Sequence, residues 1–147
     1  MYKKILVPLD GSERAEKILP HVEELGVRYQ ASVILLQVID PAVDISRASL
    51  LVPLSDHLGP RRDAAESYLN GIKARLEKKD IAVRTLVDTG IPLEIICQTA
   101  DAENVDLIAL ASHGRTGAAR LFYGSVSGGI LNRVDRPLLL VRSQKPA

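Results

Sequence analysis

Short runs of consecutive apolar residues alternate along the chain with longer segments in which apolar residues recur at every third or fourth position. Continuous runs rich in branched residues are typical of strands that are covered on both faces of a parallel sheet. Recurrence at helical spacing predicts amphipathic helices between them. We therefore expect strands at residues 3–10, 32–39, 81–88, 106–112 and 137–141. The expected helices are residues 12–30, 60–79, 92–103 and 126–134.

The alternation of strands and helices predicts the fold class. It favours an α/β fold of the Rossmann-like type, a doubly wound five-stranded parallel sheet with helices on both faces and right-handed crossovers. No internal repeat or linker divides residues 1–147, so we expect a single domain. Ligands of such sheets bind beyond the carboxyl ends of the strands, where the strand order switches.

Two segments depart from the regular pattern. Pro20 lies inside the first expected helix, where it removes one main-chain hydrogen bond, and we expect a bend near residues 16–20. Residues 40–59 show no sustained period and contain Pro41 and Pro53, so they predict a long variable loop. Loops of that length commonly act as lids or binding loops, or are disordered.

Composition excludes several classes of protein. Hydrophobic residues make up 46% of the chain, charged residues make up 25%, and the net charge is +1, as in an ordinary soluble globular domain. The longest apolar runs fall far short of the roughly 18 residues of a membrane-spanning helix. No apolar signal segment follows Lys3 and Lys4. We therefore expect a cytoplasmic protein with no membrane partner.

The cysteine, aromatic and histidine content excludes further classes of protein. Cys97 is the only cysteine, which excludes an intrachain disulfide and a cysteine metal cluster, and its apolar neighbours predict a core position. Four tyrosines and one phenylalanine are too few for the stacking platforms of single-stranded nucleic acid binders, so we expect no nucleic acid partner. His21 and His57 show no metal-ligand spacing, and no metal site is expected.

Flexible backbone and positive charge coincide near the end of the chain. Residues 111–147 carry six basic residues against one acidic residue, and five of the ten glycines lie within residues 114–129. Gly124 and Ser125 come directly before an expected helix, whose free amides and dipole favour a bound anion. The segment is therefore a candidate phosphate site, and the alternative is a loop with Ser125 as a helix cap. It has neither the Walker A ending nor the G-x-G-x-x-G spacing.

Three further residues are candidates for ligand contacts, each with a structural alternative. Asp10-Gly11-Ser12 ends the first expected strand and is a turn signal with a candidate helix cap. Asp10 is either a ribose acceptor, a helper of a phosphate-bound Mg²⁺, or a cap on the following helix. His113 is either a donor to a phosphate oxygen or an anchor of its loop. Arg115 either screens phosphate charge or is solvated.

The glycines of the basic segment form a longer pattern. Ala111 is followed by two residues, Gly114, nine further residues and then Gly124-Ser125. This resembles the signature of the nucleotide-binding branch of the universal stress protein family, in which a glycine stands where this chain has Ala111. The resemblance to the family extends to residues 4–12, 35–40 and 136–141, and it therefore covers nearly the whole length of the chain.

The resemblance implies an adenine nucleotide alpha hydrolase-like fold and the binding of ATP or a related adenine nucleotide. In relatives the end of the first strand holds adenosine and a backbone group of the second strand reads the adenine, which here implies Pro8, Leu9, Asp10 and Val38. The phosphates, which would carry Mg²⁺, are implied to lie on Ala111, Gly114, Arg115, Gly124, Ser125, Val126 and Ser127. Ala111 departs from the signature, because its methyl group would crowd the nucleotide if the backbone there needed a positive φ.

The function that follows is a nucleotide-binding stress-response or signalling module, with at most slow ATP hydrolysis. No residue stands out as a general base for the γ-phosphate, and the lysine, Mg²⁺-ligand and water-positioning set of P-loop hydrolases is missing. One alternative is a dimeric interaction module without nucleotide, although relatives of that kind lack the glycine signature. Another is an adenylate-transferring enzyme, but residues 10–13 lack a pyrophosphate loop of the SGGxDS type.

The last expected strand, residues 137–141, predicts a homodimer. Its place at the end of the chain makes it a sheet edge, and its continuous apolar side chains would be poorly protected there in a monomer. Pairing with the same strand of a second copy would satisfy the edge amides. Many members of the resembled family dimerise through this strand. The alternative is that a loop or the tail covers the edge.

Overall fold

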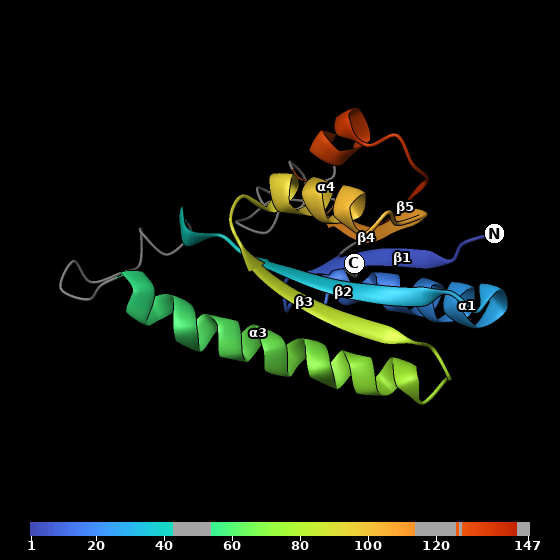
Figure 1. Ribbon diagram of the computed structural model, residues 1–147, viewed down its shortest axis with the longest axis horizontal. Coiled ribbons are helices and arrows are strands. Elements are labelled where there is room, and N and C mark those ends of the chain that lie inside the picture. Colours follow the sequence, from blue (N-terminus) through green and yellow to red (C-terminus); the bar gives the residue numbers. More distant parts are fainter. Residues whose placement is uncertain (43–53, 114–125, 127, 144–147) are drawn as a thin grey trace.

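The computed structural model describes residues 1–42, 54–113, 126 and 128–143, and it shows a parallel sheet between two layers of helices (Figure 1). Its elements are β1 (Lys4–Leu9), η1 (Ala15–Ile18), α1 (Leu19–Tyr29), β2 (Ser32–Ile39), α3 (Leu54–Glu77), β3 (Val83–Thr89), α4 (Pro92–Ala102), β4 (Leu107–His113) and β5 (Leu138–Ser143). Residues 126 and 128–133 are also helical. The described strands form one five-stranded parallel sheet in the order β3-β2-β1-β4-β5, which confirms the predicted fold class.

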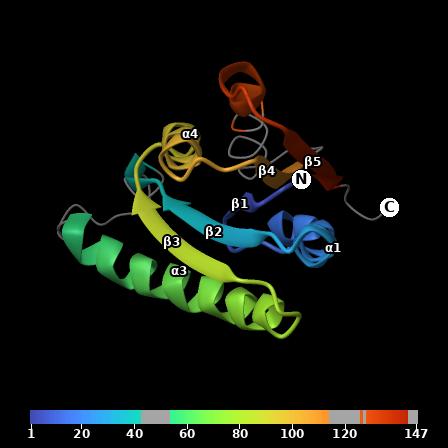
Figure 2. The same cartoon turned by 45° about the vertical axis from the view of Figure 1, so that its right-hand side comes forward.

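Helices cover both faces of the sheet (Figure 2), and one apolar cluster is buried on each face. The first lies against η1, α1 and α3, and includes Val7 and Leu35. The second lies against α4 and the helical residues 128–133, and includes Leu6 and Leu36. Because neighbouring residues of a strand point to opposite faces, the consecutive apolar residues of β1 and β2 serve both clusters.

The predicted helix over residues 12–30 is helical from Ala15 to Tyr29, but it consists of two helices that meet at Ile18 and Leu19, within residues 16–20 where a bend was expected. Ala15–Ile18 form the 3₁₀ helix η1, and α1 begins at Leu19 with Pro20 in its first turn. The N–H that proline lacks would have no intrahelical partner at that position. Pro20 therefore starts α1 and does not kink it.

The helix α3 begins earlier than the apolar pattern predicts. Its bounds are Leu54 and Glu77, so it includes residues 54–59, which the sequence assigned to the long loop. Leu54 and Leu58 stand at helical spacing, but Gly59 and Pro60 follow them, and a proline is typical of the first turn of a helix, so the pattern predicted a start at Pro60. Residues 43–53 lie outside the described residues, where the loop stays a prediction. The other predicted strands and helices are confirmed, with small differences in their bounds.

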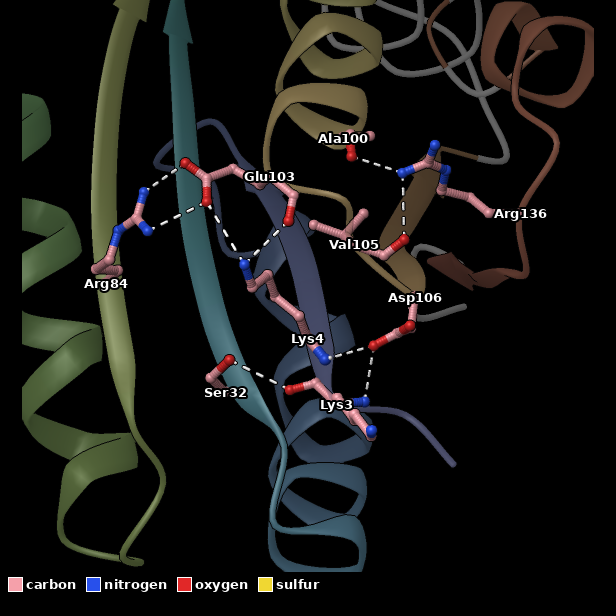
Figure 3. Close-up of polar contacts among 9 residues, drawn as sticks. All are labelled: Lys3, Lys4, Ser32, Arg84, Ala100, Glu103, Val105, Asp106 and Arg136. Atoms are coloured by element: carbon pink, nitrogen blue, oxygen red, sulfur yellow. Dashed lines mark hydrogen bonds and ion pairs between the residues drawn. The ribbon is translucent and has the colours of Figure 1, made fainter.

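A carboxylate at the amino edge of the sheet fixes the register of β1 (Figure 3). Asp106 precedes β4, and its Oδ2 atom accepts the main-chain N–H groups of Lys3 and Lys4, each at 2.9 Å. The N–H of Asp106 donates in turn to the carbonyl of Lys4 at 2.9 Å. Towards β2, Ser32 donates its N–H and its hydroxyl to the carbonyl of Lys3, at 2.9 and 3.2 Å. The first residues of β1 are thus held from both sides.

Glu103 joins the end of α4 to β1 and β3 at the same edge (Figure 3). Arg84 donates two hydrogen bonds to the Glu103 carboxylate, at 2.6 and 3.1 Å. The Nζ atom of Lys4 donates to the Glu103 carbonyl at 3.0 Å. The hydrogen bonds from Arg84 hold the pKa of the Glu103 carboxyl below its usual range, so the ion pair persists in moderately acidic solution.

Arg136 anchors the chain just before β5. Its Nη1 atom donates to the carbonyls of Ala100 and Val105, and its Nη2 atom donates to the Asp101 carboxylate at 2.7 Å. The Ala100 carbonyl belongs to the last turn of α4, where carbonyls lack intrahelical partners. The Arg136 side chain is only 15% exposed, so its contacts with the two carbonyls are partly shielded from water, whereas Asp101 is 75% exposed.

Replacing Asp106 with Ala should lower the free energy of unfolding by about 2 kcal/mol, because two main-chain donors lose a charged acceptor. Urea denaturation measures the change. The control is Asp135→Ala, which removes a carboxylate that is 92% exposed and 3.7 Å from Arg136, and should change stability by less than about 0.5 kcal/mol. Equal effects of the two substitutions would contradict the anchoring role of Asp106.

Candidate functional site

The strand order changes direction between β1 and β4, and there the pairing of the sheet is shortest. The chain passes outward from β1 to β2 and β3, and then returns to β4 and β5 on the other side. β1 pairs with β2 along its whole length. Its pairing with β4 comprises Ile5 with Leu107 and Leu6 with Ile108, although β4 and β5 stay paired up to His113. Within the described strands, the carboxyl-terminal parts of β1 and β4 therefore do not pair with each other.

Pro8 is tolerated in the central strand β1 because the pairing of β1 with β4 ends before it. In a parallel strand the N–H and C=O of one residue face one neighbouring strand, and those of the next residue face the other. The main chain of Lys4 bonds to Asp106, on the β4 side, so the main chains of Leu6 and Pro8 face β4 as well. The donor that proline lacks would point to the unpaired side.

The turn after β1 fixes the carboxylate of Asp10. Its Oδ1 atom accepts the N–H of Ser12 at 2.9 Å and the Ser12 hydroxyl at 2.6 Å, and neither bond uses Oδ2. The Ser12 hydroxyl oxygen accepts the N–H of Ala15, the first residue of η1, at 3.1 Å. Asp10 therefore does not cap η1, whose N-cap residue is Arg14, and the bond to the N–H of Ala15 comes from the Ser12 hydroxyl. The Asp-Gly-Ser signal predicted a turn and a cap, but it did not reveal that this hydroxyl also binds Asp10.

A hydrogen bond ties η1, which follows this turn, to α3. The Tyr68 hydroxyl donates to Oε2 of Glu16 at 3.0 Å. Burial raises the pKa of the Tyr68 phenol above its ordinary value, and the hydrogen bond to Glu16 and the negative charges of Glu16 and Asp10 raise it further. The phenol therefore keeps its proton and remains a donor. No sequence signal predicted this contact, because its two residues lie 52 positions apart.

Two other strands bring apolar residues to the same edge of the sheet. Val38 is next to last in β2, is 9% exposed, and belongs to the cluster against α4. Ala111 lies within β4, is 2% exposed, and belongs to the cluster against α1. It is not among the described non-glycine residues with positive φ. Its methyl group therefore enters the core, and an L-residue is accommodated where the signature has glycine.

The structure brings some of the predicted site residues together and leaves others undescribed. Because the strands are parallel, their carboxyl ends lie at one edge of the sheet. The residues there are Pro8, Leu9 and Asp10 from β1, Val38 from β2, and Ala111 with the main chain of His113 from β4. Val126 is 5% exposed and its side chain packs in the cluster against α4. Gly114, Arg115, Gly124, Ser125 and Ser127 lie outside the described residues, and their roles stay predictions.

The described groups at this edge suit binding. Asp10 is half-buried and offers a carboxylate oxygen, and the apolar side chains of Pro8 and Val38 are buried at the ends of β1 and β2. Among the residues that the structure describes, no three or more His, Cys, Asp or Glu side chains are placed to hold a metal ion.

Cys97 is buried in α4, as predicted, and burial raises the pKa of its thiol, so it is a poor nucleophile.

None of the helices in the described part of the chain combines the length and apolarity that crossing a membrane requires.

Comparison with known proteins gives the family. The model of the universal stress protein family matches residues 1–142. Universal stress protein MJ0577 of Methanocaldococcus jannaschii is 33% identical over 156 residues, which covers 97% of this chain and 96% of that protein. The solved structure of MJ0577 superposes with a TM-score of 0.84 at 34% identity, covering 99% of each chain.

Two further solved structures share the fold at lower identity. A universal stress protein in complex with cAMP has a TM-score of 0.69 at 17% identity, covering 97% of this chain and 98% of that one. The universal stress protein from Archaeoglobus fulgidus in complex with dAMP has a TM-score of 0.65 at 17% identity, covering 95% and 98%. The family match over residues 1–142 and the similarity to MJ0577 show that this chain belongs to the universal stress protein family.

Proposed function

We propose that this universal stress protein binds an adenine nucleotide, ATP first among them, and acts through its bound state in a stress response or in signalling. The observation that carries the proposal is the early end of the β1–β4 pairing, with Asp10 after β1 and the glycine signature after β4. Doubly wound sheets bind ligands at such a switch point. A nucleotide suits both the β1 side and the β4 side of the switch point. Its sugar hydroxyls can donate to the carboxylate after β1, and its phosphates can accept from main-chain amides after β4.

Adenosine would bind across the ends of β1 and β2. The Asp10 carboxylate can accept a ribose hydroxyl through Oδ2, which the turn after β1 does not use. Pro8 and Val38 alternate onto the same face of the sheet, next to the cluster against α4, and would contact the adenine ring. The main chain at Val38 would read the edge of the base. Leu9 is 2% exposed and supports the end of β1 from the other face.

The phosphates would bind the segment that follows β4. Glycine lets main-chain amides approach phosphate oxygens closely, and the helix near Val126 would direct its positive end towards them. Basic residues of this segment would offset the phosphate charge. The phosphates would carry Mg²⁺. The full proposed set is Ala111, His113, Gly114, Arg115, Gly124, Ser125, Val126 and Ser127.

The two nucleotide complexes among the structural neighbours support the ligand class. The ligands cAMP and dAMP share an adenine base, a furanose ring and a phosphate group. The two ligands differ in their sugar hydroxyls and in the number of bonds to the phosphate. Their shared groups therefore support a proposal of adenine nucleotides as a class. We propose binding with at most slow hydrolysis, since the chain lacks the lysine, metal-ligand and water-positioning set of P-loop hydrolases.

Replacing Gly124 with Asp should weaken ATP binding about tenfold or more, because a carboxylate would stand where main-chain amides and a helix terminus receive phosphates. Calorimetric titration with ATP and Mg²⁺ measures the dissociation constant. The matched control is Gly71→Asp, which places the same charge on an exposed position of α3 with open space around it. The control should bind ATP like the unmodified chain. Unchanged affinity in a folded Gly124→Asp variant would remove the phosphate assignment.

We also propose a homodimer that forms through β5. In the described sheet β5 is an edge strand. Its Leu140 side chain is 38% exposed, whereas Leu139 and Val141 are partly buried against the core. An edge strand with exposed apolar residues is prone to pair with another strand, and a twofold axis lets two copies do so with the same residues.

Replacing Leu139 and Val141 with Lys should convert the dimer to a monomer, as measured by sedimentation velocity at micromolar concentration. Since both residues also contact the core, Leu140→Lys serves as a second variant that leaves the core intact. The control is Ile91→Lys, which is 58% exposed and lies beyond β3, at the opposite edge of the sheet. The proposal fails if the unmodified chain is monomeric, or if its dimer survives all these substitutions.

A further inference from the structure

We infer that Ser12 is a positioning residue, which fixes the Asp10 carboxylate so that its second oxygen accepts the ribose hydroxyls of the bound nucleotide. The inference rests on the proposed function, because it concerns the nucleoside end of the same site. Ser12 acts here through Asp10, without touching the ligand.

Two donors from the same residue hold one carboxylate oxygen. The N–H and the hydroxyl of Ser12 both reach Oδ1 of Asp10, at 2.9 and 2.6 Å. The second distance lies in the range of charge-assisted bonds between a hydroxyl and a carboxylate. Two bonds to one atom restrict rotation of the side chain, so the direction of Oδ2 is set by the turn. An aspartate without these bonds would sample several rotamers before it met a ligand.

The hydroxyl of Ser12 is itself fixed. Its oxygen accepts the N–H of Ala15 at 3.1 Å, so its proton is left to point at Asp10. Ala15 begins η1, and the next residue of η1, Glu16, is held by the Tyr68 hydroxyl of α3 at 3.0 Å. The Asp10 carboxylate is thus connected through Ser12 and η1 to a helix that packs on the sheet.

The turn requires glycine at its centre. Gly11, between Asp10 and Ser12, has a φ of +86°, and a methyl group built on it would meet no described atom within 4 Å apart from its two chain neighbours. The chain therefore passes from Asp10 to Ser12 without a side chain over the turn. A residue with a Cβ would be strained at this φ.

The charge around the turn favours hydroxyl donors over phosphate. The carboxylates of Asp10 and Glu16 both act on the Tyr68 hydroxyl, and Arg75, 3.9 Å from Glu16, offsets part of the Glu16 charge. The Asp10 carboxylate itself would repel a phosphate group. Neutral hydroxyl groups can donate to Oδ2 at no such cost, and the ribose of a nucleotide carries them.

The experiment compares ATP with 2′,3′-dideoxy-ATP, which lacks both ribose hydroxyls, by calorimetric titration in the presence of Mg²⁺. The unmodified chain should bind ATP about tenfold or more tightly than the dideoxy analogue, because hydrogen bonds to a charged group are lost with the hydroxyls. Ser12→Ala should remove most of this preference by weakening ATP binding, and should leave the affinity for the analogue nearly unchanged. Ser12→Thr keeps a hydroxyl and should restore the preference.

Two controls separate positioning from general stability. Ser32→Ala also removes a serine hydroxyl that donates a hydrogen bond, here to the main-chain carbonyl of Lys3 at 3.2 Å. Ser32 lies at the opposite edge of the sheet, so this substitution should leave the affinities for ATP and for the dideoxy analogue unchanged. In an Asp10→Ala background, Ser12→Ala should cause no further loss of the preference, because the two residues act in series.

The outcomes distinguish the inference from the proposed function. If the unmodified chain binds neither ligand, the proposed function fails and the inference fails with it. If the chain binds ATP and Ser12→Ala weakens both ligands equally, or keeps the preference for ATP, the inference alone is overturned. The inference is also overturned if the unmodified chain binds ATP and the dideoxy analogue with equal affinity.

Discussion

Hydrogen bonds of the Lys3 and Lys4 main chain, to the carboxylate and the main chain of Asp106 and to Ser32, decide where β1 begins to pair with its two neighbours. That register controls the faces of the whole strand, because Leu6 serves one apolar cluster and Val7 the other. A slip by one residue would exchange these faces and place Asp10 on the wrong side of the sheet edge. The position of the candidate site therefore depends on contacts at the far end of the same strand.

The two edges of the sheet have different chemistry. At the amino edge, charged side chains satisfy strand and helix ends, as Asp106 does for β1 and Arg136 does for α4. At the carboxyl edge, the pairing of β1 with β4 stops early, and Pro8 lacks a donor on that side. Among the described residues at the carboxyl edge, main-chain groups and the oriented carboxylate of Asp10 are available to a ligand. Because the contacts that hold the strands lie at the amino edge, the main-chain groups of β1 and β4 at the carboxyl edge can remain unpaired with each other.

Most of the sheet could be predicted from the sequence, because strands buried on both faces appear as continuous apolar runs. Ser32–Ile39 was predicted with its observed bounds. The start of α3 was predicted too late, because Pro60 is typical of a helix start and yet lies inside the helix. Pro20 was predicted inside a helix, because the 3₁₀ turn before it has no distinct sequence signal.

The site was predictable in part for a similar reason. Strand ends follow from the apolar runs, so Asp10 and Val38 could be assigned to one edge of the sheet. The hydrogen bonds of Ser12 and the contact between Tyr68 and Glu16 depend on side-chain directions and on pairs far apart in the chain, which no periodicity contains. The roles of Gly114, Gly124 and Ser125 rest on the sequence and on the family.

The central claim is that an adenine nucleotide occupies the switch point between β1 and β4. Mass spectrometry of the small molecules released on denaturing freshly purified protein tests it most directly. The account predicts an adenine nucleotide in amounts that approach one per chain, and its depletion in the Gly124→Asp variant. A purified protein that releases no adenine nucleotide and binds none when ATP and Mg²⁺ are added at millimolar concentration would contradict it.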